Sequence, residues 1–374
     1  GTVTGTVVDP SGSPLPGAAV VVVDTRLETT TDRLGRFRIN PVPAGAQQIN
    51  VSYLGFADHT VPVTVEPSAA VDLEVGLVMA AFTGTVTVSP ILTGQAEALS
   101  EQQNAPNIVN VVSSDQIEVF PDTNAAEATQ RVPGVFIQRD QGEGRYVQVR
   151  GTAAGLNRVQ IDGEVIPSPE DDIRQVALDV VPVDLLDTMV VSKALTPDQD
   201  GDAIGGIVNL KFKDAPGEQV LQASLGGYYG DLRDGDGVQA GFSYGNRFSS
   251  DTFGLLLAAS YTDITRNTEN FEADSWEDGA PFEFETRDYN VNRERLGFVA
   301  VLDWRAGDSN FYRIKGVYND FADQEYRRRT ISNLEDNEME RELKDRYEEQ
   351  NIWTVYFDGE NNFSSSALTY KLSY

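Results

Sequence analysis

The last third of the chain alternates apolar residues with polar or small ones at a period of two. In the runs Phe253–Tyr261 and Leu296–Trp304, every second side chain is aliphatic or aromatic. Successive side chains of a strand point to opposite faces of its sheet, so these runs predict strands with one apolar face. Seven such segments of about ten residues are expected, each long enough for a tilted strand to cross a bilayer. They start near Leu221, Val238, Phe253, Leu296, Tyr312, Trp353 and Leu368.

A water-soluble antiparallel sheet with one wet face would alternate in the same way, but two features favour a membrane. Aromatic residues such as Tyr229, Tyr261 and Trp304 stand at the ends of the apolar runs, where interfacial girdles fall. The connections also alternate, because long loops are expected at 263–293 and 320–350 and short turns at positions such as 306–309. Residues 218–374 therefore read as the first seven antiparallel strands of a transmembrane β-barrel. That barrel is incomplete, because bacterial single-chain barrels start at eight strands.

The first 80 residues form short β-branched runs separated by Gly- and Pro-rich turns, the pattern of a small β-sandwich. Its expected strands are Thr2–Val8, Ala18–Asp24, Arg36–Asn40, Ile49–Tyr53, Val61–Val65 and Val71–Leu77.

The middle of the chain is predicted to be a linker at 81–106 followed by an α/β domain at 107–217. The polar stretch Thr93–Pro106 should be flexible or partly helical. Helices are expected at Ser114–Ile117 and Asn124–Arg131, and strands at Val135–Gln138, Tyr146–Arg150 and Arg158–Ile161. The fold class is therefore mainly β.

Composition removes several classes of function. The chain carries 29 basic against 58 acidic residues, a formal charge of −29, which argues against a nucleic-acid partner. It has no cysteine and one histidine, His59, so thiolate sites, thiol nucleophiles and sites built on several imidazoles are excluded. The sequence Gly241–Gly245 matches the G-x-S-x-G pattern of hydrolases, but it lies inside a predicted strand and His59 precedes it. No catalytic residue, cofactor or metal is predicted.

Two parts of the sequence resemble known families. The phrases GTVVDPSGSPLPGAAVVVVDT and TTTDRLGRFRINPVPAGAQQINVSYLGF resemble the carboxypeptidase-regulatory-like domain, which implies an accessory module without catalytic residues. The phrases PDTNAAEATQRVPGV, RDQGEGRYVQVRG and DGDAIGGIVNLK resemble the plug of TonB-dependent outer-membrane receptors, closest to the branch abundant in Xanthomonas- and Caulobacter-like bacteria. Thr129 and Asp162 depart from that pattern, where Leu and Asn are usual. We call residues 107–217 the plug region.

The second resemblance implies active uptake across a Gram-negative outer membrane, with the N-terminal domain in the periplasm, the long loops outside and membrane lipid around the barrel. The energising partner would be TonB, with ExbB and ExbD, which binds a short extended segment by β-augmentation. The best candidate for this TonB box is Thr85, Val86, Thr87, Val88 and Ser89, a β-branched stretch before the polar linker. The alternatives are a last strand of the sandwich or plain linker.

The sequence constrains the identity of the substrate less than it constrains the fold. Acidic residues crowd both long loops, apart from the basic run Arg327–Arg329, and their field would repel an anionic ferric siderophore. Aromatic residues in the first long loop could stack on sugar rings, so we expect an oligosaccharide. Residues 163–174 should form an apical plug loop that contacts this substrate. The candidate substrate contacts are Arg158, Glu164, Glu170, Asp171, Asp172, Arg174, Trp276 and Phe282. The alternatives are a siderophore or cobalamin importer, or a surface adhesion or structural β-protein.

Overall fold

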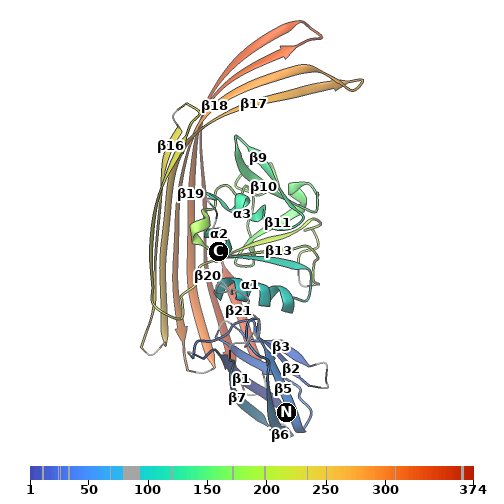
Figure 1. Cartoon of the computed structure of the whole chain (residues 1–374), viewed down its shortest axis with the longest axis vertical. Coiled ribbons are helices and arrows are strands. Elements are labelled where there is room, and N and C mark those ends of the chain that lie inside the picture. The colour runs from blue at the N-terminus through green and yellow to red at the C-terminus, as the bar shows by residue number, and fades with distance from the viewer. Residues whose placement is uncertain are drawn as a thin grey trace, which may run out of the picture.

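The computed structural model describes residues 1–78 and 93–374, except 11, 24, 26, 33, 68, 119, 121, 171, 198, 234, 250, 308, 364 and 365. A small β-domain lies at the lower end of a long curved sheet, and the plug region packs against the middle of that sheet (Figure 1). Strands hold 63% of the residues and helices 7%, which confirms the mainly β fold class. The candidate TonB box, residues 85–89, lies outside the described residues.

The N-terminal domain is a sandwich of a three-stranded and a four-stranded sheet whose apolar faces meet. Side chains such as Val3, Phe37 and Ile49 fill the space between the sheets and are almost fully buried. The expected strands are confirmed, and a short additional strand, β3, was not predicted. The sheet orders are β4-β1-β7 and β3-β2-β5-β6, with bounds β1 Thr2–Val8, β2 Ala19–Val22, β3 Glu28–Thr30, β4 Arg36–Ile39, β5 Gly45–Ser52, β6 His59–Val65 and β7 Ala70–Gly76.

The polar stretch after the TonB-box candidate is helical along almost its whole length. Helix α1 spans Thr93–Asn104 and packs Ala98 against the plug region. On its other side, the Ser100 hydroxyl and the Asn104 amide donate to the backbone carbonyl of Gly17, at 2.6 and 3.0 Å. The helix therefore joins the sandwich to the plug region, and the helical alternative of the linker prediction is confirmed for these residues.

The plug region is built on a five-stranded mixed sheet, order β12-β11-β14-β13-β8, with a separate β9-β10 hairpin above it. Helix α3 begins where the sequence suggests, because the Asn124 side chain accepts a hydrogen bond from the Glu127 amide at 3.0 Å. Strands β8, β12 and β13 were not predicted. The bounds are β8 Val109–Ser113, α2 Ser114–Glu118, α3 Ala125–Thr129, β9 Val135–Asp140, β10 Glu143–Val149, η1 Ala154–Leu156, β11 Asn157–Ile161, β12 Glu164–Val165, η2 Val183–Leu185, β13 Leu186–Ser192 and β14 Gly206–Phe212.

The seven predicted C-terminal segments form one antiparallel sheet in sequential order, which we call the wall sheet. Both predicted long loops are wrong. The strands continue through them as hairpins that turn only at 278–279 and 334–337 and bend over the plug region (Figure 1). The bounds are β15 Val220–Gly230, β16 Gly235–Phe248, β17 Phe253–Glu277, β18 Ala280–Arg305, β19 Asn310–Asn333, β20 Glu338–Asn362 and β21 Ala367–Ser373.

The two faces of the wall sheet differ as the alternation predicts. On the outward face Leu302 is 60% exposed and Val355 46%, whereas their neighbours Val301 and Tyr356 on the inward face are 0% and 1% exposed. The inward face packs on the plug region, and Val299 and Val317 join its core cluster. In the described part of the chain, no helix has both the length and the apolar content to cross a membrane.

Candidate functional site

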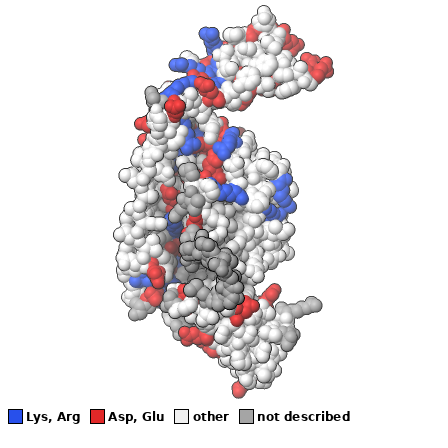
Figure 2. Space-filling view, in the orientation of Figure 1, with Lys and Arg blue, Asp and Glu red and all other residues white. Residues whose placement is uncertain are grey.

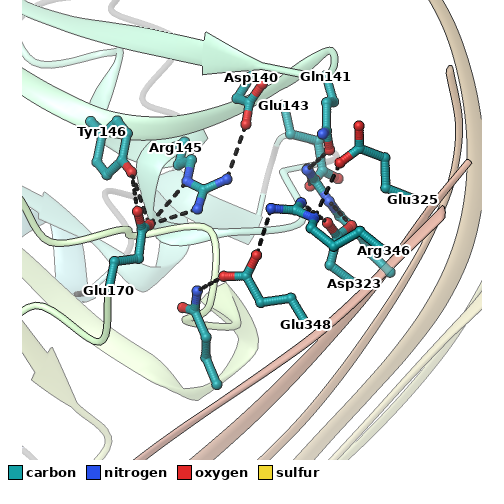
Figure 3. Close-up of polar contacts among 12 residues, drawn as sticks. Asp140, Gln141, Glu143, Arg145, Tyr146, Glu170, Asp323, Glu325, Arg346 and Glu348 are labelled. Atoms are coloured by element: carbon teal, nitrogen blue, oxygen red, sulfur yellow. Dashed lines mark hydrogen bonds and ion pairs between the residues drawn. The ribbon is translucent and has the colours of Figure 1, made fainter. Parts of the chain in front are cut away.

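The predicted substrate residues of the plug region form three separate groups of contacts. Glu170 lies beside the β9-β10 hairpin, where Arg145 donates to its Oε1 at 2.6 Å (Figure 3). The Tyr146 hydroxyl donates to both carboxylate oxygens at 2.8 Å. Burial raises the pKa of Tyr146 to about 12, and the Glu170 carboxylate adds to the shift while Arg145 opposes it. Tyr146 therefore stays a neutral donor, and this carboxylate already accepts hydrogen bonds from two plug neighbours.

A second group gathers around Asp202. Arg158 donates to it through Nε at 2.9 Å, and Arg174 approaches the same carboxylate at 2.5 Å. These hydrogen bonds, first the one from Arg158, lower the pKa of Asp202. Two predicted residues are thus brought together, but by an acidic residue that the prediction did not include.

The remaining plug candidates do not join either group among the described contacts. Glu164 pairs with Lys371 of the wall sheet at 3.1 Å. Asp172 is exposed and has a left-handed backbone with φ of 57°. Asp171 lies outside the described residues. The described contacts therefore do not bring the predicted plug residues into one group, and their role in substrate binding stays a prediction.

The two aromatic candidates lie on strands of the β17-β18 hairpin rather than in a loop. Trp276 is 63% exposed beside the turn and donates from Nε1 to the Ala273 carbonyl at 3.3 Å. Phe282 is half-buried, and its carbonyl accepts from the Leu334 amide of the neighbouring hairpin at 2.8 Å. Close by, the rings of Phe271 and Phe284 stack with centroids 5.8 Å apart. The hairpin therefore offers aromatic faces, held on a rigid β-ladder, above the plug region.

A heavily buried charged cluster between plug and wall was not predicted from the sequence. Glu143, at the start of β10, is 1% exposed and meets three wall arginines: Arg266 at 2.8 Å, Arg293 at 2.6 Å and Arg295 at 2.6 Å. Burial opposes ionisation of Glu143, but the three guanidinium groups outweigh it and hold its pKa well below the usual range. Arg295 also donates to the Asp179 carbonyl at 2.6 Å. We call Glu143 and these three arginines the tip cluster.

The wall continues the tip cluster as a ledge of paired charges (Figure 3). Arg293 and Arg346 both reach Asp323, at 3.1 and 2.7 Å, and Arg346 also meets Glu325 and Glu348, at 3.2 and 2.6 Å. One member of the basic run noted in the sequence is compensated as well, since Arg329 lies against Glu342 at 2.8 Å. Basic and acidic side chains are thus matched along the inner face of the wall. Figure 2 shows blue and red atoms mixed where the hairpins leave the plug region.

Lower on the wall a second set of ion pairs holds the floor of the plug region. Lys315 is fully buried, lies 3.1 Å from Asp162 and donates to the Phe212 carbonyl at 2.6 Å. Arg313 pairs with Asp214 and, at 2.8 Å, with Asp358. Plug and wall are therefore joined at both ends by charges taken from distant parts of the chain.

One group of carboxylates on the β17-β18 hairpin approaches a metal-ligating geometry: Asp274, Glu283 and Glu285. Glu285, the buried member, is already paired with Arg287 at 2.6 Å and with Arg329 at 3.3 Å. Two guanidinium groups thus neutralise the carboxylate that a cation would need, so we assign no ion here.

Comparisons with known proteins agree with the resemblances of the sequence. Residues 2–78 match the carboxypeptidase regulatory-like domain family, and residues 101–207 match the TonB-dependent receptor plug domain family. The vitamin B12 transporter BtuB of Photobacterium profundum is 30% identical over 123 residues, which are 32% of this chain and 20% of that protein. A TonB-dependent receptor of Formosa agariphila is 28% identical over 145 residues, 38% of this chain and 13% of that protein. The matched part thus spans a fifth or less of either relative.

Solved structures of receptors were also matched. The siderophore receptor PirA of Acinetobacter baumannii gives a TM-score of 0.40 at 17% identity, over 74% of this chain and 48% of that one. The unliganded ferric citrate transporter FecA gives 0.37 at 11% identity, over 74% and 60%. These scores are too low to add to the assignment, which rests on the two domain matches and the two sequence relatives. By these matches the chain carries a carboxypeptidase regulatory-like domain at residues 2–78 ahead of a TonB-dependent receptor plug domain at residues 101–207.

Proposed function

We propose that the protein imports a neutral oligosaccharide across a Gram-negative outer membrane by a TonB-dependent mechanism. The observation that carries this proposal is the wall sheet, whose outward face is apolar and whose inward face is ion-paired to the plug. An exposed apolar face of this size needs hydrocarbon or another protein layer to cover it. Strands that alternate apolar-out and polar-in are typical of outer-membrane barrels.

The orientation follows from the same geometry. The sandwich and the short turns lie at one end of the wall sheet, and the long hairpins at the other (Figure 1). In outer-membrane barrels short turns face the periplasm, so we assign the sandwich to the periplasm and the hairpins to the outside. TonB, energised by ExbB and ExbD, would then reach the segment Thr85–Ser89 between the sandwich and α1.

The choice of a neutral substrate rests on the charge pairing of the inner wall. An anionic siderophore needs unpaired cations, but Arg293, Arg329 and Arg346 already have carboxylate partners. A polyhydroxylated ligand needs donors, acceptors and an aromatic face instead, which the ledge and Trp276 offer. The alternative is a siderophore or cobalamin importer, the class to which the names of BtuB, PirA and FecA point. The other alternative is a surface adhesion or structural β-protein, which none of the contacts among the described residues specifically favours.

The test compares uptake and surface binding in cells that express the intact receptor. Radiolabelled neutral oligosaccharides, ferric siderophores and cobalamin are offered to receptor-positive and receptor-negative cells. We expect receptor-dependent accumulation of an oligosaccharide only. Accumulation of a siderophore or cobalamin instead would refute the proposed substrate class.

The TonB step has its own matched pair of variants. Val86→Pro with Val88→Pro removes two backbone donors that β-augmentation uses, whereas Val86→Ala with Val88→Ala keeps them. Uptake should be lost in the proline variant and retained in the alanine variant, with equal receptor abundance and equal surface binding. Undiminished uptake in the proline variant would show that the TonB box lies elsewhere or that uptake does not need it.

A further inference from the structure

A large polar cavity lies between the sandwich and the lower end of the wall sheet. Its volume is about 730 Å³, against about 370 Å³ for the cavity between the plug and strands β15–β17. The Arg38 guanidinium donates to the Phe363 carbonyl at 2.6 Å and closes one side. The cavity therefore has walls from two domains, at the end of the molecule that we assign to the periplasm.

The sandwich contributes an ordered polar surface to this cavity. In the sheet β4-β1-β7, Thr4 stands opposite Arg38 on one side and Asp72 on the other, and Thr6 stands opposite Arg36. The Thr4 hydroxyl donates to Asp72 at 2.9 Å. Directly opposed residues share one face of a sheet, so these side chains form two parallel rows of hydroxyl and charged groups.

The wall contributes Arg305 and Glu360 from its inward face. Arg305 is two residues from buried Asp303, and Glu360 two residues from buried Asp358, so both continue the face that packs on the plug. The Nε of Arg305 is buried without a hydrogen-bond partner, and it belongs to a residue that lines the cavity. A buried guanidinium donor left unpaired is costly, so the described contacts do not fully satisfy Arg305 at the wall of this cavity.

The charges that line the cavity cancel. They comprise three arginines, Arg36, Arg38 and Arg305, and three carboxylates, Asp32, Asp72 and Glu360. Burial raises the pKa of Asp32, the backbone amide of Arg36 opposes this shift, and the nearby carboxylate of Glu360 adds to it. Such a lining does not favour a strong anion or a strong cation. It suits a neutral ligand with many hydroxyl groups.

We propose that this cavity is a second binding site for the transported oligosaccharide, on the periplasmic side of the plug. The inference rests on the proposed function and assigns a role to the N-terminal sandwich. Guanidinium and carboxylate groups each offer two parallel hydrogen-bonding atoms, which suits neighbouring hydroxyls of a sugar ring. The threonine hydroxyls both donate and accept, and the volume is in the range of small-molecule sites. An oligosaccharide released along the inner wall would reach this site before it leaves the receptor.

The test is photo-cross-linking of the intact receptor in detergent, where both ends are accessible. The probe is a diazirine derivative of the oligosaccharide that the uptake assay identifies, and the labelled peptides are mapped by mass spectrometry. We expect label in two places: on the β17-β18 hairpin and on peptides that contain Thr6, Arg36 or Glu360.

Two variants address the cavity from its two sides: Thr6→Val with Arg36→Gln on the sandwich, and Glu360→Gln on the wall. Each should lower cavity labelling about tenfold, the effect of one or two lost hydrogen bonds, and leave hairpin labelling unchanged. The matched control is Thr60→Val with Thr64→Val, on exposed positions of β6 in the other sheet, and should change neither. Label confined to the hairpin, or cavity label equal in variants and control, would overturn the second site while the proposed function stands. Label at neither place would overturn the second site and the predicted hairpin contact, whereas the proposed function is decided separately by the uptake assay.

Discussion

Replacing Glu143 by glutamine should release the tip of the plug from the wall. The carboxylate is 1% exposed and contacts three arginines at 2.6 to 2.8 Å. Glutamine has nearly the same shape and keeps one acceptor, but it removes the charge that balances Arg266, Arg293 and Arg295. The three guanidinium groups would then repel one another in a site from which water is largely excluded.

The size of the effect follows from the burial of the cluster. Removing one partner of a buried ion pair costs about 3 to 5 kcal/mol, and the retained hydrogen bond places this variant near 3 kcal/mol. At 1.4 kcal/mol for each factor of ten, local opening of the hairpin should become about 100-fold more frequent. The change should be confined to β9 and β10, because the lower ion pairs at Lys315 and Arg313 are untouched.

Hydrogen exchange of the intact receptor in detergent measures this opening directly, since backbone amides of β10 exchange through it. The matched control is Glu164→Gln, which breaks the plug–wall pair with Lys371. Those side chains are 39% and 25% exposed, so the loss should stay within about 1 kcal/mol, or about fivefold. A second control, Glu143→Gln combined with Arg293→Gln, removes one of the repelling charges and should restore part of the protection.

Two results would refute this account of the tip cluster. In the first, the exchange rates of β10 amides in Glu143→Gln lie within about threefold of those in the unchanged receptor. In the second, Glu164→Gln raises the exchange rates as much as Glu143→Gln does. Either would mean that apolar packing, and not the ion cluster, holds the tip to the wall.

Three further predictions concern pH, substrate and membrane. Because the pKa of Glu143 is lower in the folded state, its ionised carboxylate stabilises the fold fully above the unfolded-state pKa of about 4.3. That stabilisation is lost only as pH falls through the lower folded-state pKa. The exchange rate of β10 amides, corrected for intrinsic rates, should therefore not change from pH 7 to 5. Trp276→Ala should weaken surface binding of the oligosaccharide about tenfold in a radioligand assay through loss of one stacking face, whereas Trp304→Ala at the opposite end should not. Leu302 lies only two residues from Trp304 at the expected interface, so Leu302→Arg should cost about 1 to 2 kcal/mol in the bilayer and lower the amount of folded receptor on heat-modifiability gels, whereas Leu302→Met should not.

The sequence predicts the wall strands well where the outward face must be apolar. Leu255 to Ile264 and Leu296 to Trp304 alternate because one face is apolar and exposed while the other packs on the plug region. Beyond Ile264 the same strand continues for thirteen residues to Glu277, but there both faces are polar. Period-two hydrophobicity vanishes once neither face needs to be apolar, and therefore the hairpins were interpreted as loops. Only their β-branched and aromatic content, as in Phe271 and Phe284, hinted at strands.

The contacts of the candidate site were less accessible to sequence reasoning, because they join residues far apart in the chain. Arg158 and Arg174 were selected as neighbours of the predicted apical loop, yet what brings them together is Asp202, which lies 44 residues after Arg158. Glu170 was selected as a substrate contact, but it already accepts hydrogen bonds from Arg145 and Tyr146. A charge in a loop says little about its availability until its partners are known.

The tip cluster was half predictable from strand geometry. Arg293 and Arg295 are two residues apart, so they share a face, and the register places Ile264 opposite Arg293 and Val291 opposite Arg266. All three arginines must therefore point to the same side, where buried cations need carboxylate partners from the plug or from the wall itself. What strand parity does not supply is which carboxylate. The two-residue turn at Gln141 and Gly142, both with left-handed backbones, fixes Glu143 as the first residue of β10. Glu143 lies 150 residues before Arg293 in the sequence, so the two side chains meet only when the plug docks against the wall.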